Sequence, residues 1–380
     1  MKKLIRITTS DISLDLLLKG QLKFLNRYYE VVGVSSDTGL LQQVARREGI
    51  RVAELSMKRN ISLRRDLACL IHLIRLFHKE KPFIVHANTP KASLLAMTAA
   101  WIDRVPHRIY TVTGLRYQGM SGLGRAILKT TERITCLMAN KVIPEGQGVK
   151  QTLRADCITS KPLEVIHHGN INGIDTSHFN ADACRATRQQ IRKTLHIDDN
   201  DFTFIFIGRI VKDKGMDELA MAMKNISASN HHCKLILVGW FEKEHDSIKE
   251  FSEDFFKYNS CVRYVGYRKD VRPYLLAADA LVFPSYREGF PQVVMEAGAM
   301  GLPSIVTDIN GCNEIIVEGE NGQIIPPKDS EALYKAMEHF LNSPQGVAYM
   351  ASNARRMIQL RYEHEDVMKE LLKMYRTLES

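Results

Sequence analysis

The sequence predicts an α/β protein built from two doubly wound domains, and three observations support this prediction. The chain has 380 residues, about twice the usual size of one domain. Short β-branched runs alternate with helical patterns along its length, as in stacked βαβ units with a parallel sheet. The alternation is interrupted at residues 167–175, which are rich in Gly and Asn and lack periodicity. We therefore expect one Rossmann-like domain over residues 1–178 and a second over residues 179–380.

The first half contains short apolar runs that are typical of buried strands, separated by helical patterns. The segment 63–79 places Leu67, Leu70 and Phe77 on one face, with Arg64 and Arg75 elsewhere. Such a helix could contact a membrane, but every doubly wound fold needs helices that cover the sheet, and we prefer that interpretation. The strands expected in this half cover residues 4–8, 31–34, 51–55, 83–86, 108–112 and 164–166.

The second half repeats the pattern with a new series of apolar runs and helices. Because the series restarts, a second parallel sheet is expected rather than an extension of the first. A final helix, about residues 365–378, is expected beyond the last strand. It could stay with the second domain or return to the first. The strands expected here cover residues 202–207, 234–238, 263–265, 280–283 and 304–307.

The composition is that of an ordinary globular protein, with 45% hydrophobic and 25% charged residues. The longest apolar stretches, such as residues 92–102, are too short to span a bilayer, and the N-terminus does not resemble a secretion signal. The cysteines number seven and lack a Cys-x-x-Cys pair, which argues against a disulfide framework and a structural zinc site. We expect a cytoplasmic protein.

The net charge of +9 is unevenly distributed. Residues 1–178 hold 27 Lys and Arg against 14 Asp and Glu, whereas residues 179–380 hold 25 against 29. The first half is therefore cationic and the second mildly acidic. A cationic domain is suited to an anionic membrane surface or an anionic lipid-linked substrate. We prefer these partners to a merely solvated surface, and we do not expect nucleic acid, because no nucleic-acid-binding motif accompanies the charge.

Two glutamates mark a candidate ligand-binding site, at the point where an apolar strand turns into a helix. Glu288 follows the strand 280–283, and Glu296 lies in the helix that we expect from Pro291, as first helical residue, to about Met300. Ligands of parallel sheets bind beyond the carboxyl ends of the strands, where helix N-termini present free amides. The plainer alternatives are that Glu288 pairs with Arg287 and that Glu296 faces solvent.

The start of the second domain resembles a phosphate cradle. Gly208 follows a hydrophobic strand and is succeeded by Arg209 and Lys214, which supply charge where other phosphate loops use several glycines. The alternative is an ordinary lysine-rich loop. Together with the glutamates, the cations suit a nucleotide sugar, with Glu288 on the sugar hydroxyls and Glu296 on the ribose. The acidic run at residues 198–201 precedes a strand and is typical of a turn, so we expect neither a metal site nor a cofactor.

From Gly208 to Glu296 and on to Asn310 and Gly311, the chain resembles the donor half of a retaining GT-B glycosyltransferase of sequence family 4, and its length fits that two-domain plan. The resemblance implies two Rossmann-like domains facing each other across a cleft. It also implies a nucleotide-diphosphate sugar in the second domain and an acceptor mostly in the first. The donor positions that it implies are Gly208, Arg209, Lys214, Tyr267, Glu288, Gly289, Phe290, Pro291 and Glu296, with Tyr267 near the base.

Residues 89–92 and 110–115 further resemble enzymes that extend polyprenyl-diphosphate-linked sugars in bacterial capsule or O-antigen assembly. This resemblance implies a UDP-sugar donor carrying an N-acetylhexosamine or hexose, and a peripheral position on the inner face of the cytoplasmic membrane. A nucleotide-sugar 2-epimerase of the same fold is the alternative activity, and a binding protein without turnover is a third class. The acceptor-binding positions implied are Ser13, Lys91, Thr113 and Arg116.

The chain departs from its relatives in two loops of the first domain. Residues 8–11 lack the glycine pair that many relatives have after the first strand, and Thr113 occupies the place of the usual catalytic histidine. His86, at the end of the strand 83–86, is a candidate replacement, although a lone histidine at such a position is more often structural. The main catalytic hypothesis therefore concerns Arg209, Lys214 and Glu288, which would stabilise the departing diphosphate and bind the sugar.

Overall fold

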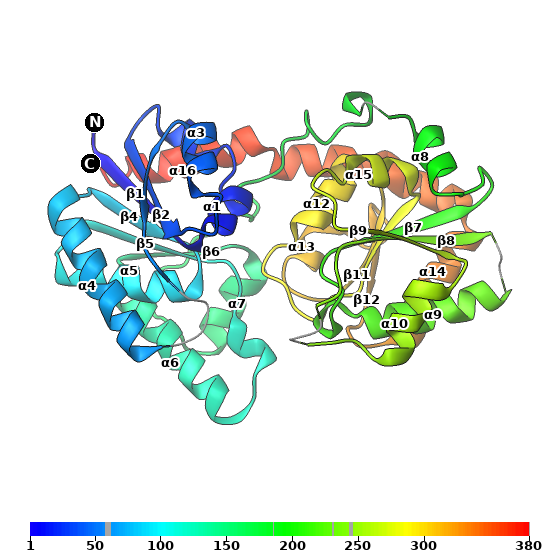
Figure 1. Ribbon diagram of the computed structural model, residues 1–380, viewed down its shortest axis with the longest axis horizontal. Helices are drawn as coiled ribbons and strands as arrows, with labels where there is room; N and C mark the ends of the chain where they lie inside the picture. Colours follow the sequence, from blue (N-terminus) through cyan, green and yellow to red (C-terminus); the bar gives the residue numbers. More distant parts are fainter. Residues whose placement is uncertain (58–61, 185, 230–231, 243–245, 380) are drawn as a thin grey trace. The chain divides into compact units, whose positions relative to one another are not determined.

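The computed structural model describes residues 1–57, 62–184, 186–229, 232–242 and 246–379. The chain divides into two compact units (Figure 1). Unit 1 comprises Met1–Gly173 with His364–Ser380, and unit 2 comprises Ile174–Glu363. The division falls between Gly173 and Ile174, whereas the sequence analysis placed it near residue 178. The final helix, α16 (His364–Arg376), belongs to unit 1.

The sheet of unit 1 has the strand order β3-β2-β1-β4-β5-β6, and neighbouring strands pair in parallel. β1 lies between β2 and β4, with Leu4 opposite both Val31 and Ile84. The order reverses direction between β1 and β4, which makes this a doubly wound sheet with a switch point there. The strands are β1 (Lys3–Ser10), β2 (Glu30–Ser36), β3 (Arg51–Glu54), β4 (Ile84–Ala87), β5 (His107–Val112) and β6 (Lys141–Pro144).

Helices cover both faces of this sheet, and each face has its own apolar cluster. Leu73 and Phe77 of α4 are fully buried, so this helix covers the sheet, but Leu67 of the predicted apolar face is 58% exposed. On the other face, Leu371 and Tyr375 of α16 pack with Leu4 of β1. One face carries α4 (Leu63–Glu80), α5 (Pro90–Ile102), α6 (Gly122–Met138) and α7 (Gln147–Ala155), with the 3₁₀ helix η1 (Arg116–Gly119) before α6; the other carries α1 (Asp11–Leu17), α2 (Gln21–Leu25), α3 (Leu41–Glu48) and α16.

The last strand of this sheet is not the one that the sequence predicted. Residues 164–166 are not a strand, and the nearest pairing is an isolated bridge between Leu163 and Val142. The edge strand is β6, a short run that ends in Pro144. A proline lacks the amide needed to continue a ladder, so it is tolerated at an edge but weakens the strand pattern in the sequence.

The sheet of unit 2 repeats the topology, with the order β12-β11-β10-β7-β8-β9 and parallel pairing. β12 was not predicted from the sequence, because Asn321 and Gly322 are typical of a turn. Gly322 instead begins the strand, where a Cβ would lie 2.1 Å from the Ser304 carbonyl oxygen. The strands are β7 (Phe202–Ile207), β8 (Cys233–Val238), β9 (Val262–Gly266), β10 (Ala280–Phe283), β11 (Ser304–Thr307) and β12 (Gly322–Ile325).

Helices also cover both faces of the second sheet (Figure 1). Figure 1 shows α9, α10 and α14 on one face, and α8, α12 and α15 on the other. The helices are α8 (Arg188–Thr194), α9 (Met216–Ser229), α10 (Glu250–Tyr258), α11 (Arg272–Ala277), α12 (Gln292–Ala299), α13 (Cys312–Ile315), α14 (Ser330–Asn342) and α15 (Pro344–Tyr362), with the 3₁₀ helices η2 (Ala181–Ala183) and η3 (Lys212–Lys214).

The position of β7 beside β10 decides where a ligand site can form in unit 2. Phe204 and Ile205 pair with Ala280 and Leu281, although these strands are far apart in the sequence. The strand order reverses between them, so the loops that follow their carboxyl ends border the crevice of a doubly wound sheet. Those two loops carry the cations and the glutamate that the sequence analysis selected.

Candidate active site

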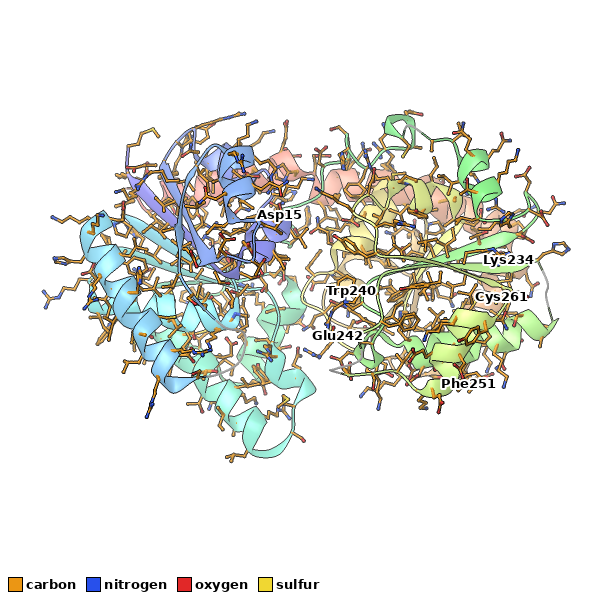
Figure 2. All side chains as sticks on the ribbon, viewed as in Figure 1. Asp15, Lys234, Trp240, Glu242, Phe251 and Cys261 are labelled. Atoms are coloured by element: carbon orange, nitrogen blue, oxygen red, sulfur yellow. The ribbon has the colours of Figure 1, made fainter. Side chains whose placement is uncertain are left out.

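Arg209 stands directly beyond the carboxyl end of β7, after Gly208, and its guanidinium is paired. Its Nη1 donates to Oε2 of Glu242 at 2.6 Å, and both side chains are partly exposed. Glu242 follows β8, and Figure 2 places it and Trp240 at the opposite end of the sheet from Lys234. The sequence analysis did not identify Glu242, because nothing in its spacing relates it to Arg209. Sheet pairing of β7 with β8 brings them together.

Lys214 ends the 3₁₀ helix η3 and forms an ion pair with Glu288. Its Nζ also lies 5.1 Å from the ring centroid of Phe283, the last residue of β10. Both charged side chains are mostly buried, with exposed fractions of 17% and 16%. The cation that follows β7 and the carboxylate that follows β10 are therefore in direct contact.

The turn at Gly215 makes this contact possible. Gly215 has a φ of 69°, and a Cβ there would lie 2.0 Å from the Pro284 carbonyl oxygen. Only glycine therefore allows η3 to lie so close to the loop after β10. Two hydrogen bonds also hold η3 close to the loop after β10. The Tyr286 amide donates to the Asp213 carbonyl at 2.8 Å, and Arg287 Nε donates to the Asp213 carboxylate at 2.9 Å.

The carboxylate of Glu288 has a second donor in the hydroxyl of Ser285, at 2.7 Å. Arg287 contacts Asp213 instead, so the alternative in which Glu288 pairs with Arg287 is not observed. Burial raises the pKa of the nearby Cys312 thiol well above its usual range, and the charge of Glu288 raises it further. Cys312 is therefore a neutral packing residue rather than a nucleophile.

The loop between β10 and α12 is fixed by close backbone contacts. A Cβ on Gly311 would lie 2.5 Å from the Gly289 carbonyl oxygen and 2.7 Å from Cα of Phe290. Helix α12 begins at Gln292 with Pro291 as its N-cap, so the prediction of Pro291 as the first helical residue was wrong by one position. The extended ψ of 112° at Pro291 explains the difference, because an N-cap residue lies outside the helical region.

Two further donor positions from the sequence analysis lie in the same unit. Glu296 is a partly buried residue of α12. Tyr267 follows β9 and is 62% exposed, and its ring meets that of Trp240 edge-on with centroids 5.5 Å apart. Because β7, β8 and β9 are consecutive neighbours, this aromatic pair lies at the carboxyl edge that also carries Arg209. The sequence analysis did not select Trp240.

The acceptor-binding candidates lie at the carboxyl edge of the other sheet, in unit 1. Ser13 follows β1 on α1, where its hydroxyl is 3.3 Å from that of Ser10. Lys91 is the second residue of α5, which follows β4, and it pairs with Asp66 at 2.6 Å. Thr113 follows β5 and donates to the Asn88 carbonyl at 3.0 Å, and Arg116 is exposed on η1.

His86 lies in β4 as a buried member of a polar network. Its Nδ1 is 3.0 Å from Arg6 Nη1 and 2.5 Å from the Tyr375 hydroxyl, and its Nε2 is 2.6 Å from the Thr111 hydroxyl. Burial, together with the neighbouring Arg6 charge, lowers the pKa of His86 well below its usual value. Both ring nitrogens are thus engaged inside the unit, which is the environment of a structural histidine.

The acidic run at residues 198–201 forms a turn, in which the Asp201 amide donates to the Asp198 carbonyl at 3.0 Å. Among the described residues, no group of three or more His, Cys, Asp or Glu is arranged to hold a metal ion. In the same part of the chain, no helix combines the length and apolar character needed to cross a membrane.

The two doubly wound units, with paired cations and carboxylates at the switch point of the second, define a protein with the layout of a GT-B glycosyltransferase. Residues 187–357 match the family described as "Glycosyl transferases group 1", and residues 22–178 match "Glycosyltransferase Family 4". The capsular polysaccharide biosynthesis glycosyltransferase CapM of Staphylococcus aureus is 33% identical over 380 residues, which cover 99% of this chain and 97% of that protein. The chain therefore belongs to the family 4 glycosyltransferases.

Other known proteins extend this comparison. The UDP-Gal:alpha-D-GlcNAc-diphosphoundecaprenol alpha-1,3-galactosyltransferase of Escherichia coli is 27% identical over 311 residues, covering 79% of this chain and 76% of that enzyme. The crystal structure of HepE from Anabaena in complex with UDP-glucose superposes with a TM-score of 0.80 at 19% identity, covering 99% of this chain and 100% of that one. The latter comparison shows a shared fold. The protein is a glycosyltransferase, and no finding favours the epimerase.

Proposed function

We propose that this enzyme moves a sugar from a UDP-sugar to a polyprenyl-diphosphate-linked saccharide, with retention at the anomeric carbon, during cell-surface polysaccharide assembly. Two relatives support the proposal through their names. The Escherichia coli relative is named for a UDP-linked donor and a diphosphoundecaprenol-linked acceptor, and the Staphylococcus aureus relative for capsular polysaccharide biosynthesis. The transferred sugar would be an N-acetylhexosamine or a hexose.

The observation that carries the donor assignment is the contact between Lys214 and Glu288 where β7 and β10 end side by side. A diphosphate near Lys214 and Arg209 would meet two cations that are now paired with Glu288 and Glu242. Phosphate oxygens can replace these carboxylates, since Arg and Lys bind both through charge-assisted hydrogen bonds. Glu288 would then accept hydrogen bonds from the sugar, and Glu296 from the ribose.

In the proposed reaction, an acceptor hydroxyl oxygen attacks the anomeric carbon on the face from which the diphosphate leaves. The bond between the anomeric carbon and the diphosphate oxygen breaks, its electron pair stays on that oxygen, and the same oxygen takes the hydroxyl proton. This route needs no side-chain base, which agrees with Thr113 in the position of the usual histidine and with the burial of His86. Arg209 and Lys214 would supply the main stabilisation, by neutralising the departing diphosphate without a metal ion.

The acceptor would bind mainly to unit 1, near Ser13, Lys91, Thr113 and Arg116. The excess of Lys and Arg in residues 1–178 suits an anionic acceptor diphosphate and an anionic membrane surface. We therefore propose a peripheral position on the inner face of the cytoplasmic membrane.

A product analysis tests this function. The enzyme is incubated with a panel of UDP-sugars, with and without a short lipid-diphosphate monosaccharide, and both UDP and the lipid product are measured. The transferase predicts UDP release that depends on the acceptor and an α-linked product. Formation of an epimer without acceptor would establish the alternative epimerase activity. If the protein binds UDP but turns over no combination of UDP-sugar and acceptor, it is a binding protein.

A further inference from the structure

Helix α6 presents an apolar stripe to the solvent. Leu123 and Leu137 are 78% and 67% exposed, and Ile127 and Ile134 between them are also exposed. Their spacing of four, seven and three residues keeps them on one side of a helix, and Met120 extends the stripe just before the helix begins. We call Met120, Leu123, Ile127, Ile134 and Leu137 the α6 stripe.

This stripe is not the core face of the helix. The side of α6 that packs on the sheet carries Glu132, Thr135 and Cys136, all of them buried. Helix α4, which was considered for membrane contact from the sequence, directs Leu73 and Phe77 into the core and exposes a shorter apolar run, Leu67 and Ile71. A continuous exposed apolar stripe on a soluble surface usually marks a contact with another phase or partner.

A basic row runs along one side of the stripe. Arg125, Lys129 and Arg133 follow one another at intervals of four residues, so they share a flank between the buried face and the apolar one. Lys129 pairs with Asp156 at 2.5 Å. Arg133 donates to the backbone carbonyls of Asp156 and Cys157, both at 3.2 Å, so those contacts leave its charge uncompensated.

We propose that this face of α6 docks on an anionic lipid surface, with the α6 stripe entering the boundary of the acyl chains and the basic row meeting the headgroups. An apolar stripe flanked by Lys and Arg is what an interfacial helix requires. The charge favours lipid over a second copy of this chain, because two copies would bring like-charged rows together. The proposal deepens the proposed function, since it rests on a lipid-linked acceptor that must be reached at a membrane.

The test compares vesicle binding of matched variants of the full chain. Leu123→Gln with Leu137→Gln removes the two most exposed stripe residues, and binding to vesicles of phosphatidylglycerol and phosphatidylcholine is measured by sedimentation. Each lost leucine should weaken partitioning by about tenfold. Leu67→Gln on α4, 58% exposed, and Leu360→Gln on α15, 68% exposed, are the controls and should change it by less than about twofold. Equal loss in the Leu67 variant would overturn the assignment to α6.

The basic row is tested separately with Arg125→Gln and Arg133→Gln. This pair should weaken binding to phosphatidylglycerol vesicles about thirtyfold, at about 1 kcal/mol per cation, and leave the weaker binding to pure phosphatidylcholine unchanged. Vesicle binding that does not change with salt concentration or with phosphatidylglycerol content would contradict the proposed contact of the basic row with lipid headgroups. If sedimentation velocity shows a dimer that the stripe variant converts to monomer, the partner is a second copy and the lipid proposal is wrong.

Turnover distinguishes this proposal from the one on which it rests. The stripe variant should keep wild-type turnover of a water-soluble acceptor with a short chain and lose turnover of an acceptor embedded in vesicles. The wild-type enzyme could bind vesicles, lose that binding in the stripe variant, and yet turn over neither acceptor. That result would refute the proposed reaction and still support the docking face. Unchanged vesicle binding by the stripe variant would refute the docking face alone.

Discussion

Lys214 donates to the carboxylate of Glu288 across the junction between the end of β7 and the end of β10. From the sequence, these residues have separate expected roles: the lysine binds the diphosphate and the glutamate binds the sugar. Their contact means that each compensates the charge of the other in a mostly buried position. Removal of either partner therefore leaves an uncompensated charge, and their variants must be chosen with that in mind.

Glu288→Gln should reduce kcat at least about a hundredfold, because the carboxylate would stabilise the transferred sugar in the transition state. The glutamine is nearly isosteric, and its oxygen can still accept from the Ser285 hydroxyl. The affinity for UDP, measured by titration calorimetry, should not fall, because UDP lacks the sugar and the variant frees Lys214 for the diphosphate. A variant with normal kcat would refute the sugar assignment.

Lys214→Met should weaken the binding of UDP itself, by about ten- to a hundredfold, because a charge-assisted hydrogen bond to phosphate contributes about 1.5–3 kcal/mol. Lys214→Arg is the matched control, since it keeps the charge and should recover part of the affinity. Thermal unfolding without ligand separates this effect from the loss of the ion pair with Glu288. Equal UDP affinity in Lys214→Met and wild type would exclude a phosphate role.

Glu242→Gln should tighten UDP binding by about two- to fivefold. The carboxylate of Glu242 now holds the Arg209 guanidinium, and a partly exposed ion pair of this kind is worth about 0.2–1 kcal/mol, which a phosphate must overcome. Arg209→Gln should weaken binding, and adding Glu242→Gln to it should produce no further change. If Glu242→Gln tightens UDP binding equally in the wild type and in the Arg209→Gln variant, the two residues act independently.

Gly215→Ala should destabilise unit 2 by at least about 2 kcal/mol more than Gly319→Ala, as measured by urea denaturation. Both glycines have positive φ, 69° and 75°, so both variants carry the strain of a left-handed residue. Only at Gly215 would the new Cβ meet backbone, the Pro284 carbonyl oxygen, because the position at Gly319 has open space. Equal losses would mean that the close approach of η3 to the β10 loop is not required for stability.

Glu132 makes the stability of unit 1 depend on pH. Burial raises its pKa to about 7 from an ordinary value of 4.5, while the Tyr110 hydroxyl donates to its carboxylate at 2.8 Å. Between these values the folded state keeps a proton that the unfolded chain has lost, so stability falls as the pH rises. Glu132→Gln should therefore be stabilised over the wild type by about 3 kcal/mol at pH 8 and by almost nothing at pH 4.5. A constant difference in the midpoint of urea unfolding would contradict this.

Most of the fold could be predicted from local pattern, and the misses have local causes. The buried strands at residues 202–207, 280–283 and 304–307 agree with β7, β10 and β11 to the residue, because continuous apolar runs between turn residues are a strong signal. The edge strands β6 and β12 were missed because one ends in proline and the other begins with a glycine that resembled a turn. Pairing at an edge depends on the neighbouring strand, which a local pattern does not contain.

The sequence by itself determined which residues could bind a ligand in unit 2. Arg209, Lys214 and Glu288 each follow an apolar strand, and their chemistry is readable from the chain. Only the tertiary structure decided their partners, since the pairing of β7 with β10 and with β8 brings Lys214 to Glu288 and Arg209 to Glu242. It also decided that His86 is enclosed, that α6 exposes an apolar stripe, and that α4 buries Leu73 and Phe77 while Leu67 stays exposed. Strand order and burial are set by contacts between distant segments, and spacing along the chain does not encode them.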